Sequence, residues 1–313
     1  MQVNKTDETL QLFLSAIGPE VKLLFDDEKT TDIVLNNDSR LWIKRLGMDW
    51  EYAGFTIQPV TAERIITLVA SSVNSVITRE NAGVTAEIPG YKHRFEGTMG
   101  DATDNPTFAI RKHSRFVFTL DDYIAMNILS PKQKQEIIRG VYEKDNFLIA
   151  GDTGSGKTTF GNAILAEIAK TGDRIGIIQD TNELQCNAEN KFEFRANDFN
   201  SYDMLLKKML RYYPKRIVLG EVRGIEALTL IDAWGTGHSG GLCTIHSQAP
   251  ALEALTRLER LISRASVSPQ QYAIASTVKT IIYIEEYKGG RRIPEIIKVH
   301  GFDGKNYITS SIV

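Results

Sequence analysis

The segment 151–158, Gly-Asp-Thr-Gly-Ser-Gly-Lys-Thr, constrains the fold more than any other part of the chain. It matches G-x-x-x-x-G-K-[ST] at every fixed position, and in this pattern the glycines let successive backbone N–H groups turn toward a phosphate. The apolar run 146–150 before it is typical of a buried strand, and residues 160–169 after it have helical apolar spacing. This order of strand, glycine loop and helix predicts a phosphate-binding unit in an α/β domain.

The residues of this loop have distinct predicted roles. Lys157 supplies a positive charge for the β- and γ-phosphates, and the Thr158 hydroxyl can hold Mg²⁺. The helix that follows directs the positive end of its dipole at the same anion. The predicted phosphate-binding residues are Gly151, Asp152, Thr153, Gly154, Ser155, Gly156, Lys157, Thr158 and Thr159.

Composition narrows the class of protein. The chain has 313 residues, enough for about two domains, and its net charge of −2 provides no general attraction for nucleic acid or anionic membrane. Its two cysteines lack metal-ligand spacing and suit a reducing compartment. No signal peptide or run of about 18 apolar residues is recognisable. We therefore expect a cytoplasmic protein that reaches a membrane only through partners.

The first half of the chain mixes helical and strand patterns and has no nucleotide motif of its own. The expected elements are helices at 6–17 and 61–73 and strands at 31–36, 41–44, 84–97 and 107–111. These patterns predict an N-terminal α+β domain over residues 1–115, followed by a linker over residues 116–131.

From residue 132 to residue 313 strands and helices alternate. Strands are expected at 146–150, 174–179, 192–195, 216–220 and 242–246, helices at 131–143, 157–170, 201–212, 224–235 and 250–264, and three short strands within 279–312. Such alternation predicts a mainly parallel sheet with helices on both faces.

Acidic residues follow two of these strands. Glu221 comes directly after the apolar run 215–220, where P-loop NTPases place the residue that binds Mg²⁺ through water; the alternative is a surface acid that caps the next helix. Asp180 and Glu183 follow the run 175–179 and could hold Mg²⁺ or orient an attacking water, although an acidic turn of this kind is commonly only solvated.

Histidines and arginines complete the candidate set. His246 ends a predicted strand and His238 lies in a glycine-rich loop, and both places can face a phosphate. Arg94, Arg111 and Arg115 lie late in the first half, where they could clamp phosphate if the two halves close over a nucleotide. Arginines in such positions more commonly form weak surface ion pairs.

Four motifs stand in order along the chain: GDTGSGKT, QDTNEL, GEVRG and GTGHSGGLCTIHS. Together they resemble the secretion ATPase superfamily of type II and type IV secretion systems, most closely its conjugal-transfer, TrbB-like branch. The resemblance implies an N-terminal α+β domain, a C-terminal RecA-like P-loop domain, and a homohexamer that hydrolyses ATP with Mg²⁺. It also implies partners among other secretion-system ATPases and inner-membrane components, and a position at the inner face of the bacterial inner membrane.

The resemblance also assigns roles by position. The catalytic residues are Lys157, Glu183, Glu221 and His246, with Glu183 polarising the attacking water and His246 sensing the γ-phosphate. The metal ligands are Thr158, Glu221 and Asp180, and the phosphate-side arginines of the N-terminal domain are Arg94 and Arg111. Gln179 departs from the family pattern, which has Glu before the Asp, and because Gln cannot act as a base the catalytic load shifts to Glu183 and Glu221. The four-cysteine zinc module of the type II relatives is absent.

Two other functions are consistent with the same core. A nucleic-acid motor would need basic loops interleaved with aromatic residues; the nearest candidate, residues 207–213, is better interpreted as an amphipathic helix with a solvated basic face. No sequence-specific nucleic-acid binding is expected. A non-hydrolysing assembly platform, in which nucleotide only locks an oligomer, is disfavoured by the intact Lys157, Thr158, Glu183 and Glu221.

Overall fold

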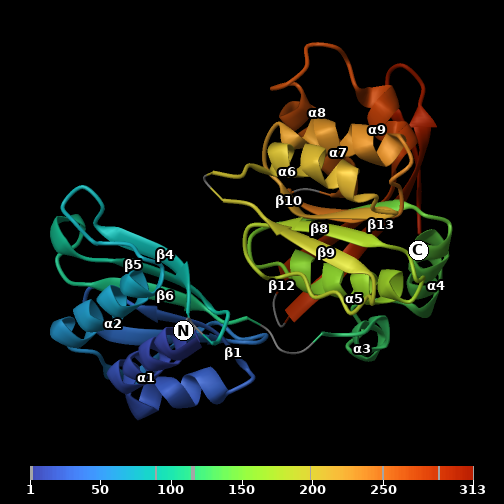
Figure 1. Cartoon of the computed structure of the whole chain (residues 1–313). Coiled ribbons are helices and arrows are strands. Elements are labelled where there is room, and N and C mark those ends of the chain that lie inside the picture. The colour runs from blue at the N-terminus through green and yellow to red at the C-terminus, as the bar shows by residue number, and fades with distance from the viewer. Residues whose placement is uncertain are drawn as a thin grey trace. The chain divides into compact units, whose positions relative to one another are not determined.

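The computed structural model describes residues 3–88, 90–113, 117–197, 199–248, 250–287 and 290–312, with the side chains of 3–9 left out. The chain divides into two compact units, Met1–Arg115 and Phe116–Val313, each with its own hydrophobic core (Figure 1). Among the described residues no helix has the length and apolar character needed to cross a membrane.

The first unit is an antiparallel sheet with two helices. Its elements are α1 (Val3–Asp26), β1 (Thr30–Leu35), β2 (Arg40–Arg45), β3 (Trp50–Thr56), α2 (Pro59–Ser72), β4 (Gly83–Glu87), β5 (Arg94–Thr98) and β6 (Thr107–Arg111), with a 3-10 turn at Gly100–Ala102. The strand order is β3-β2-β1-β6-β5-β4. Alternate strand residues such as Ile33, Leu41 and Phe95 are buried with side chains of α1 and α2, so both helices contribute to one core on one face of the sheet.

Three features of this unit differ from the sequence expectations. β3 was not expected, because it is an edge strand whose residues are all at least partly exposed and whose pattern is therefore weak. The expected strand 84–97 is a hairpin, β4 and β5, joined at residues 88–93. α1 extends well past residue 17, although Gly18 (φ 77°) and Pro19 interrupt its helical backbone.

The second unit contains an eight-stranded sheet. Its helices are α3 (Leu120–Ala125), α4 (Pro131–Tyr142), α5 (Lys157–Ala169), α6 (Tyr202–Met209, continued by a 3-10 turn to Tyr212), α7 (Glu226–Gly235), α8 (Ala251–Ile262) and α9 (Gln271–Thr277). Its strands are β7 (Asn146–Gly151), β8 (Ile175–Gln179), β9 (Lys191–Arg195), β10 (Arg216–Val222), β11 (Leu242–His246), β12 (Val278–Tyr287), β13 (Gly290–Phe302) and β14 (Tyr307–Ser311).

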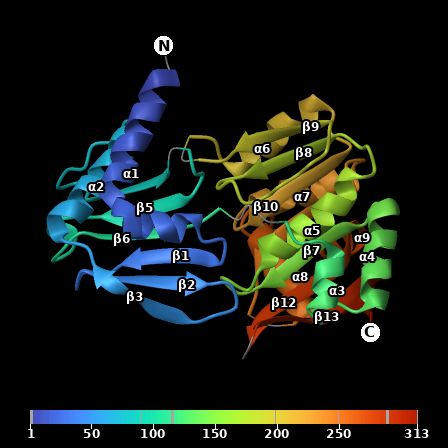
Figure 2. The ribbon, with the colours of Figure 1, turned by 90° about the horizontal axis from the view of Figure 1, so that it is seen from below.

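The strand order is β14-β13-β12-β7-β11-β10-β8-β9, parallel from β12 to β9 and antiparallel at β13 and β14. Alternate residues of β7 enter two different cores: Leu148 packs in the core with residues of α6 to α9, and Phe147 and Ile149 pack in the core with residues of α3 to α5. Helices therefore cover both faces of the sheet (Figure 2), which confirms the predicted fold class.

Two details of this unit refine the sequence expectations. β10 continues to Val222, so Glu221 lies within the strand rather than after it. The segment 116–131, expected to be a linker, contains α3, whose first residues form a capping box between Thr119 and Asp122. Leu120 and Tyr123 of α3 are buried in the core of the second unit.

Candidate active site

The glycine loop has the curled geometry that its sequence predicts. Gly154 (φ 79°) and Gly156 (φ 97°) adopt left-handed backbone conformations. A Cβ atom at Gly151 would lie 2.2 Å from the Ile284 carbonyl oxygen and 2.5 Å from Ser155 Oγ, so only glycine fits there. Ser155 is 1% exposed, and its hydroxyl oxygen is buried with no hydrogen-bond partner. A tightly curled loop with an unsatisfied hydroxyl fits a phosphate ligand.

Lys157, the first residue of α5, folds back over this loop. Its Nζ donates to the carbonyl oxygens of Gly151 (3.0 Å) and Asp152 (2.8 Å). Burial lowers the pKa of Lys157, while the negative charges of Glu221, Asp152 and Glu183 oppose that shift. Three carboxylates therefore lie close enough to act on one ammonium group.

Strand register explains why distant motifs meet at this loop. β11 pairs in parallel with β7 so that His246 lies opposite Gly151, and β10 pairs with β11 so that Val222 lies opposite Ile245. Because the carboxyl ends of parallel strands share one sheet edge, the residues that end β7, β11 and β10 become neighbours.

A chain of polar contacts runs along this edge. The Nδ1 atom of His246 lies 3.5 Å from Lys157 Nζ, and its Nε2 atom lies 3.0 Å from Glu221 Oε1. The latter pair is within ion-pair distance but is not aligned as a hydrogen bond, so Glu221 Oε1 is buried without a donor. Burial and the charge of Lys157 lower the pKa of His246, against the opposing effect of Glu221, so the imidazole is neutral at pH 7.

Arg223 links the two predicted acidic positions. Its Nε and Nη2 atoms donate to Glu221 Oε2 at 2.9 and 2.7 Å, and its Nη1 atom donates to Asp180 Oδ2 at 2.8 Å. Burial opposes ionisation of Asp180, but the charge of Arg223 and hydrogen bonds from Thr181 outweigh it and lower the pKa. Asp180 is therefore a carboxylate at neutral pH.

The donor set fits Mg²⁺ that is shared with a phosphate. No cluster of three or more His, Cys, Asp or Glu side chains that could hold a metal occurs within the residues that the structure describes. Mg²⁺ commonly uses one or two carboxylates together with substrate phosphates and water. Thr158 at the start of α5 and the buried, donor-free Oε1 of Glu221 could supply such ligands.

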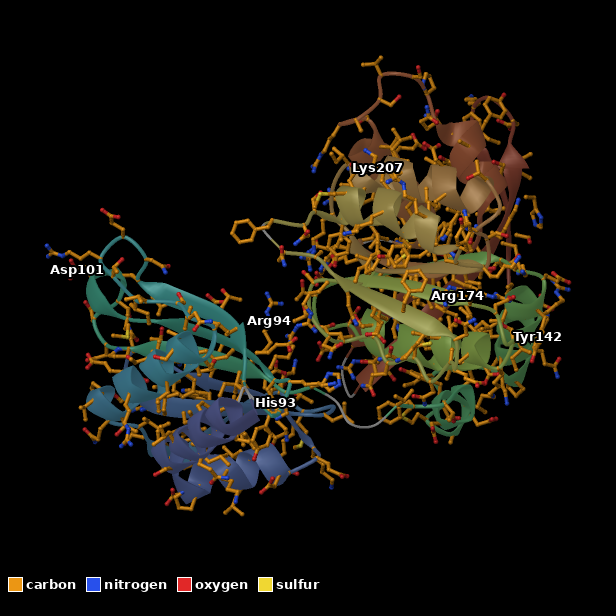
Figure 3. All side chains as sticks on the ribbon, viewed as in Figure 1. His93, Arg94, Asp101, Tyr142, Arg174 and Lys207 are labelled. Carbon is orange, nitrogen blue, oxygen red and sulfur yellow. The ribbon has the colours of Figure 1, made fainter. Side chains whose placement is uncertain are left out.

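The N-terminal arginines lie together in their own unit. Arg94 of β5 (labelled in Figure 3) pairs directly with Arg111 of β6, and both residues are exposed. Arg111 donates through Nε to Asp32 Oδ1 at 2.9 Å. Acidic residues lie opposite both arginines on the neighbouring strands, Glu87 opposite Arg94 and Asp32 opposite Arg111, so carboxylates within the sheet offset the two positive charges. Arg115 lies outside the described residues.

His238 does not join the group, which corrects the expectation that it faces a phosphate. It precedes β11, and its Nδ1 atom donates to the Pro214 carbonyl oxygen at 2.8 Å. Pro214 precedes β10, so this contact lies at the amino ends of the parallel strands, opposite the glycine loop.

Two arginines of this site were not among the residues predicted from the sequence. Arg223 stands in the quoted GEVRG motif, where its charge beside a predicted acid was the available signal. Arg291 of β13 donates through Nη2 to the Gly154 carbonyl oxygen at 3.3 Å, and its Nε atom is buried without a partner. No local pattern marks Arg291, because its contact depends on the return of β13 beside β12.

Comparison with known proteins gives matches over most of the chain. The family model described as "Type II/IV secretion system protein" matches residues 32–285. Conjugal transfer protein TrbB of Rhizobium radiobacter is 40% identical over 296 residues, 94% of this chain and 91% of the relative. A probable conjugal transfer protein TrbB of Sinorhizobium fredii is 39% identical over 294 residues, 93% of this chain and 90% of the relative.

The fold is also similar to that of a solved structure. The X-ray structure of the Yersinia pseudotuberculosis ATPase DotB matches with a TM-score of 0.64 and 18% identity, over 91% of this chain and 79% of that chain. At this identity the likeness concerns the fold alone.

Proposed function

The chain belongs to the type II/IV secretion system protein family, and from that premise we propose that it is a Mg²⁺-dependent ATPase that powers transfer in a type IV secretion or conjugation system. Membership confirms the resemblance inferred from the four motifs. The observation that carries the proposal is the convergence of Lys157, His246, Glu221, Arg223 and Asp180 on the edge of the sheet beside the glycine loop.

In the proposed reaction the loop and Lys157 bind the nucleotide phosphates. Lys157 exchanges its two carbonyl contacts for phosphate oxygens and stabilises the charge that develops on them. Mg²⁺, when bound, neutralises charge on the β- and γ-phosphates. Thr158 and Glu221 would hold it, and Asp180, which shares Arg223 with Glu221, would be a further ligand.

Glu183 is proposed to polarise the attacking water. Its backbone carbonyl oxygen accepts a hydrogen bond from Asn162 of α5, the helix that begins at Lys157, and its charge opposes the lowering of the Lys157 pKa. His246 contacts both Lys157 and Glu221, a position from which it can report whether a γ-phosphate is present. Arg94 and Arg111 are proposed to close on the nucleotide from the N-terminal unit, since two neighbouring guanidinium groups can bind phosphate oxygens once they leave their carboxylate neighbours.

The assembly and setting are further parts of the proposal. We infer a homohexamer that works with other secretion-system ATPases and with inner-membrane components, and that contacts the inner face of the membrane through them. A nucleic-acid motor gains no support from α6, where Lys207 pairs with Asp203 and Leu206 and Met209 are buried, as in an ordinary amphipathic helix (Figure 3).

The test measures ATP hydrolysis by the wild type and Lys157→Ala, with Mg²⁺ and with EDTA, while particle mass is recorded over a protein concentration series. Activity that needs Mg²⁺, appears with a species about six times 35.0 kDa and falls by roughly a thousandfold or more in the variant is expected. A monomer that is equally active, or activity only with DNA, would contradict the proposal.

A further inference from the structure

Two buried amide side chains hold the backbone of the segment 180–185, which carries Glu183. Gln179, 3% exposed, ends β8, and Asn162, 5% exposed, lies in α5. Neither amide can act as a base, and neither has a role in the proposed chemistry. Their hydrogen bonds nevertheless end on the residues around Glu183.

Gln179 binds the segment through both ends of its amide. Its Oε1 atom accepts the backbone N–H groups of Glu183 (3.0 Å) and Leu184 (2.8 Å), and its Nε2 atom donates to Asn182 Oδ1 at 3.2 Å. The Glu183 N–H also donates to the Thr181 carbonyl oxygen at 2.8 Å, so the buried Leu184 N–H is the donor that depends on Gln179. Losing the partner of a buried donor costs more than an average hydrogen bond.

Asn162 binds the same segment from the P-loop helix. Its Nδ2 atom donates to the Glu183 carbonyl oxygen at 2.9 Å, and its Oδ1 atom accepts the Gln185 backbone N–H at 2.9 Å. The N–H and C=O groups of Glu183 are thus each fixed by a different amide, one from the end of β8 and one from the helix that begins at Lys157.

We propose that Gln179 and Asn162 are positioning residues that set the distance of Glu183 from Lys157 during ATP hydrolysis. The proposal rests on the role suggested above for Glu183. It explains why Gln can stand where a catalytic carboxylate is expected: the position needs an acceptor for two N–H groups, which the amide oxygen provides. A Glu could accept the same pair, provided that the Asn182 amide turns to present its donor.

Three substitutions at Gln179 test whether the position needs a hydrogen-bond acceptor or only the volume of the side chain. Gln179→Met keeps chain length but has no strong acceptor, so kcat should fall about 10- to 100-fold with KM for ATP nearly unchanged. Gln179→Glu restores the acceptor and should recover most of kcat, whereas Gln179→Ala should behave like the methionine variant. Asn162→Ala should also lower kcat, and the double variant should lose less than the product of the single losses because both act on Glu183.

Asn146 supplies a matched control at the other end of the sheet. It is 2% exposed, accepts the N–H groups of Gly240 (2.7 Å) and Gly241 (3.1 Å), and donates to the Thr277 carbonyl oxygen at 2.9 Å. Asn146→Ser should lower the melting temperature as Gln179→Met does, but should leave kcat per folded molecule unchanged.

Hydrogen exchange provides a readout that does not need activity. Exchange of the amides in 180–185 should accelerate in Gln179→Met and not in Asn146→Ser. A Gln179→Met enzyme with wild-type kcat, or one that loses no more kcat than Asn146→Ser at equal stability, would overturn the proposal. An inactive wild type with the expected exchange pattern would instead contradict the ATPase function, and it would still support the role of Gln179 in holding the backbone of 180–185.

Discussion

The two ends of the parallel sheet each use an arginine from β10 or the residue after it, and they use it differently. At the amino ends Arg216 is 1% exposed and binds Asp173 (2.8 Å) and the carbonyl oxygens of Val141 and Gly240 (both 2.9 Å). At the carboxyl ends the Arg223 side chain is 55% exposed and binds two carboxylates.

The partners explain the difference in use. Carbonyl oxygens belong to the backbone and cannot leave, so Arg216 ties α4, β10 and the loop before β11 into one structure. The carboxylates of Glu221 and Asp180 can exchange an arginine for a metal or water, and the contact between Arg223 and Asp180, whose side chains are 55% and 34% exposed, is cheap to break. The arginine contacts at the amino ends of the strands are therefore structural, whereas those at the carboxyl ends can be exchanged for a ligand.

The largest effect on stability is expected from Arg216→Met, which tests the structural role of the contacts at the amino ends. It leaves two buried carbonyl oxygens without their partner and Asp173 with only the ion pair to Lys144, and such losses cost about 3–5 kcal/mol. We expect the second unit to unfold at much lower urea concentration while the transition of the first unit stays in place, since each unit has its own core. Tryptophan fluorescence and circular dichroism would follow the two transitions. A variant as stable as the wild type would refute the structural role of Arg216.

Arg223→Gln tests the other end. Loss of the bidentate contact releases Glu221, so kcat should fall about 10- to 100-fold. The melting temperature should fall less than in Arg216→Met, because the Arg223 side chain is 55% exposed and the Arg216 side chain is 1% exposed. Arg223→Lys keeps the charge without the two-pronged geometry and should be intermediate. Steady-state kinetics and thermal unfolding on the same samples provide the measurement. A large stability loss with unchanged kcat would erase the contrast between the two ends.

The smallest expected effect is the pH dependence of the stability that Asp173 provides at the amino ends of the strands. Burial opposes ionisation of Asp173, but the hydrogen bond and charge of Arg216 outweigh it and lower the pKa below the usual value of about 4. A lowered folded-state pKa stabilises the protein above about pH 4, and that contribution is lost as pH falls through the folded pKa. The difference in unfolding free energy between wild type and Asp173→Asn should therefore shrink below pH 4 in urea titrations. A difference that stays constant from pH 7 to pH 3 would contradict this linkage.

Sequence patterns predicted the backbone of the site better than its side-chain contacts. The meeting of the glycine loop, Glu221 and His246 follows from a topological rule, because parallel strands bring their carboxyl ends to one edge. The same rule would have excluded His238, which precedes its strand. Arg291 and the Gln179 hydrogen bonds depend on the path of particular loops, which no periodicity records. β3 was not predicted because an edge strand buries few side chains, so its alternation of apolar and polar residues is weak.

The pairing of β11 with β7 has a consequence for insertions and deletions. Deleting one residue within β11 would put Ser247 opposite Gly151 and turn Cys243 and Ile245 away from the core in which they are buried. Residues added at 265–269, between α8 and α9 and outside any strand, would leave that pairing intact. Length changes in relatives of this chain should accordingly collect in such connections and avoid the five residues of β11.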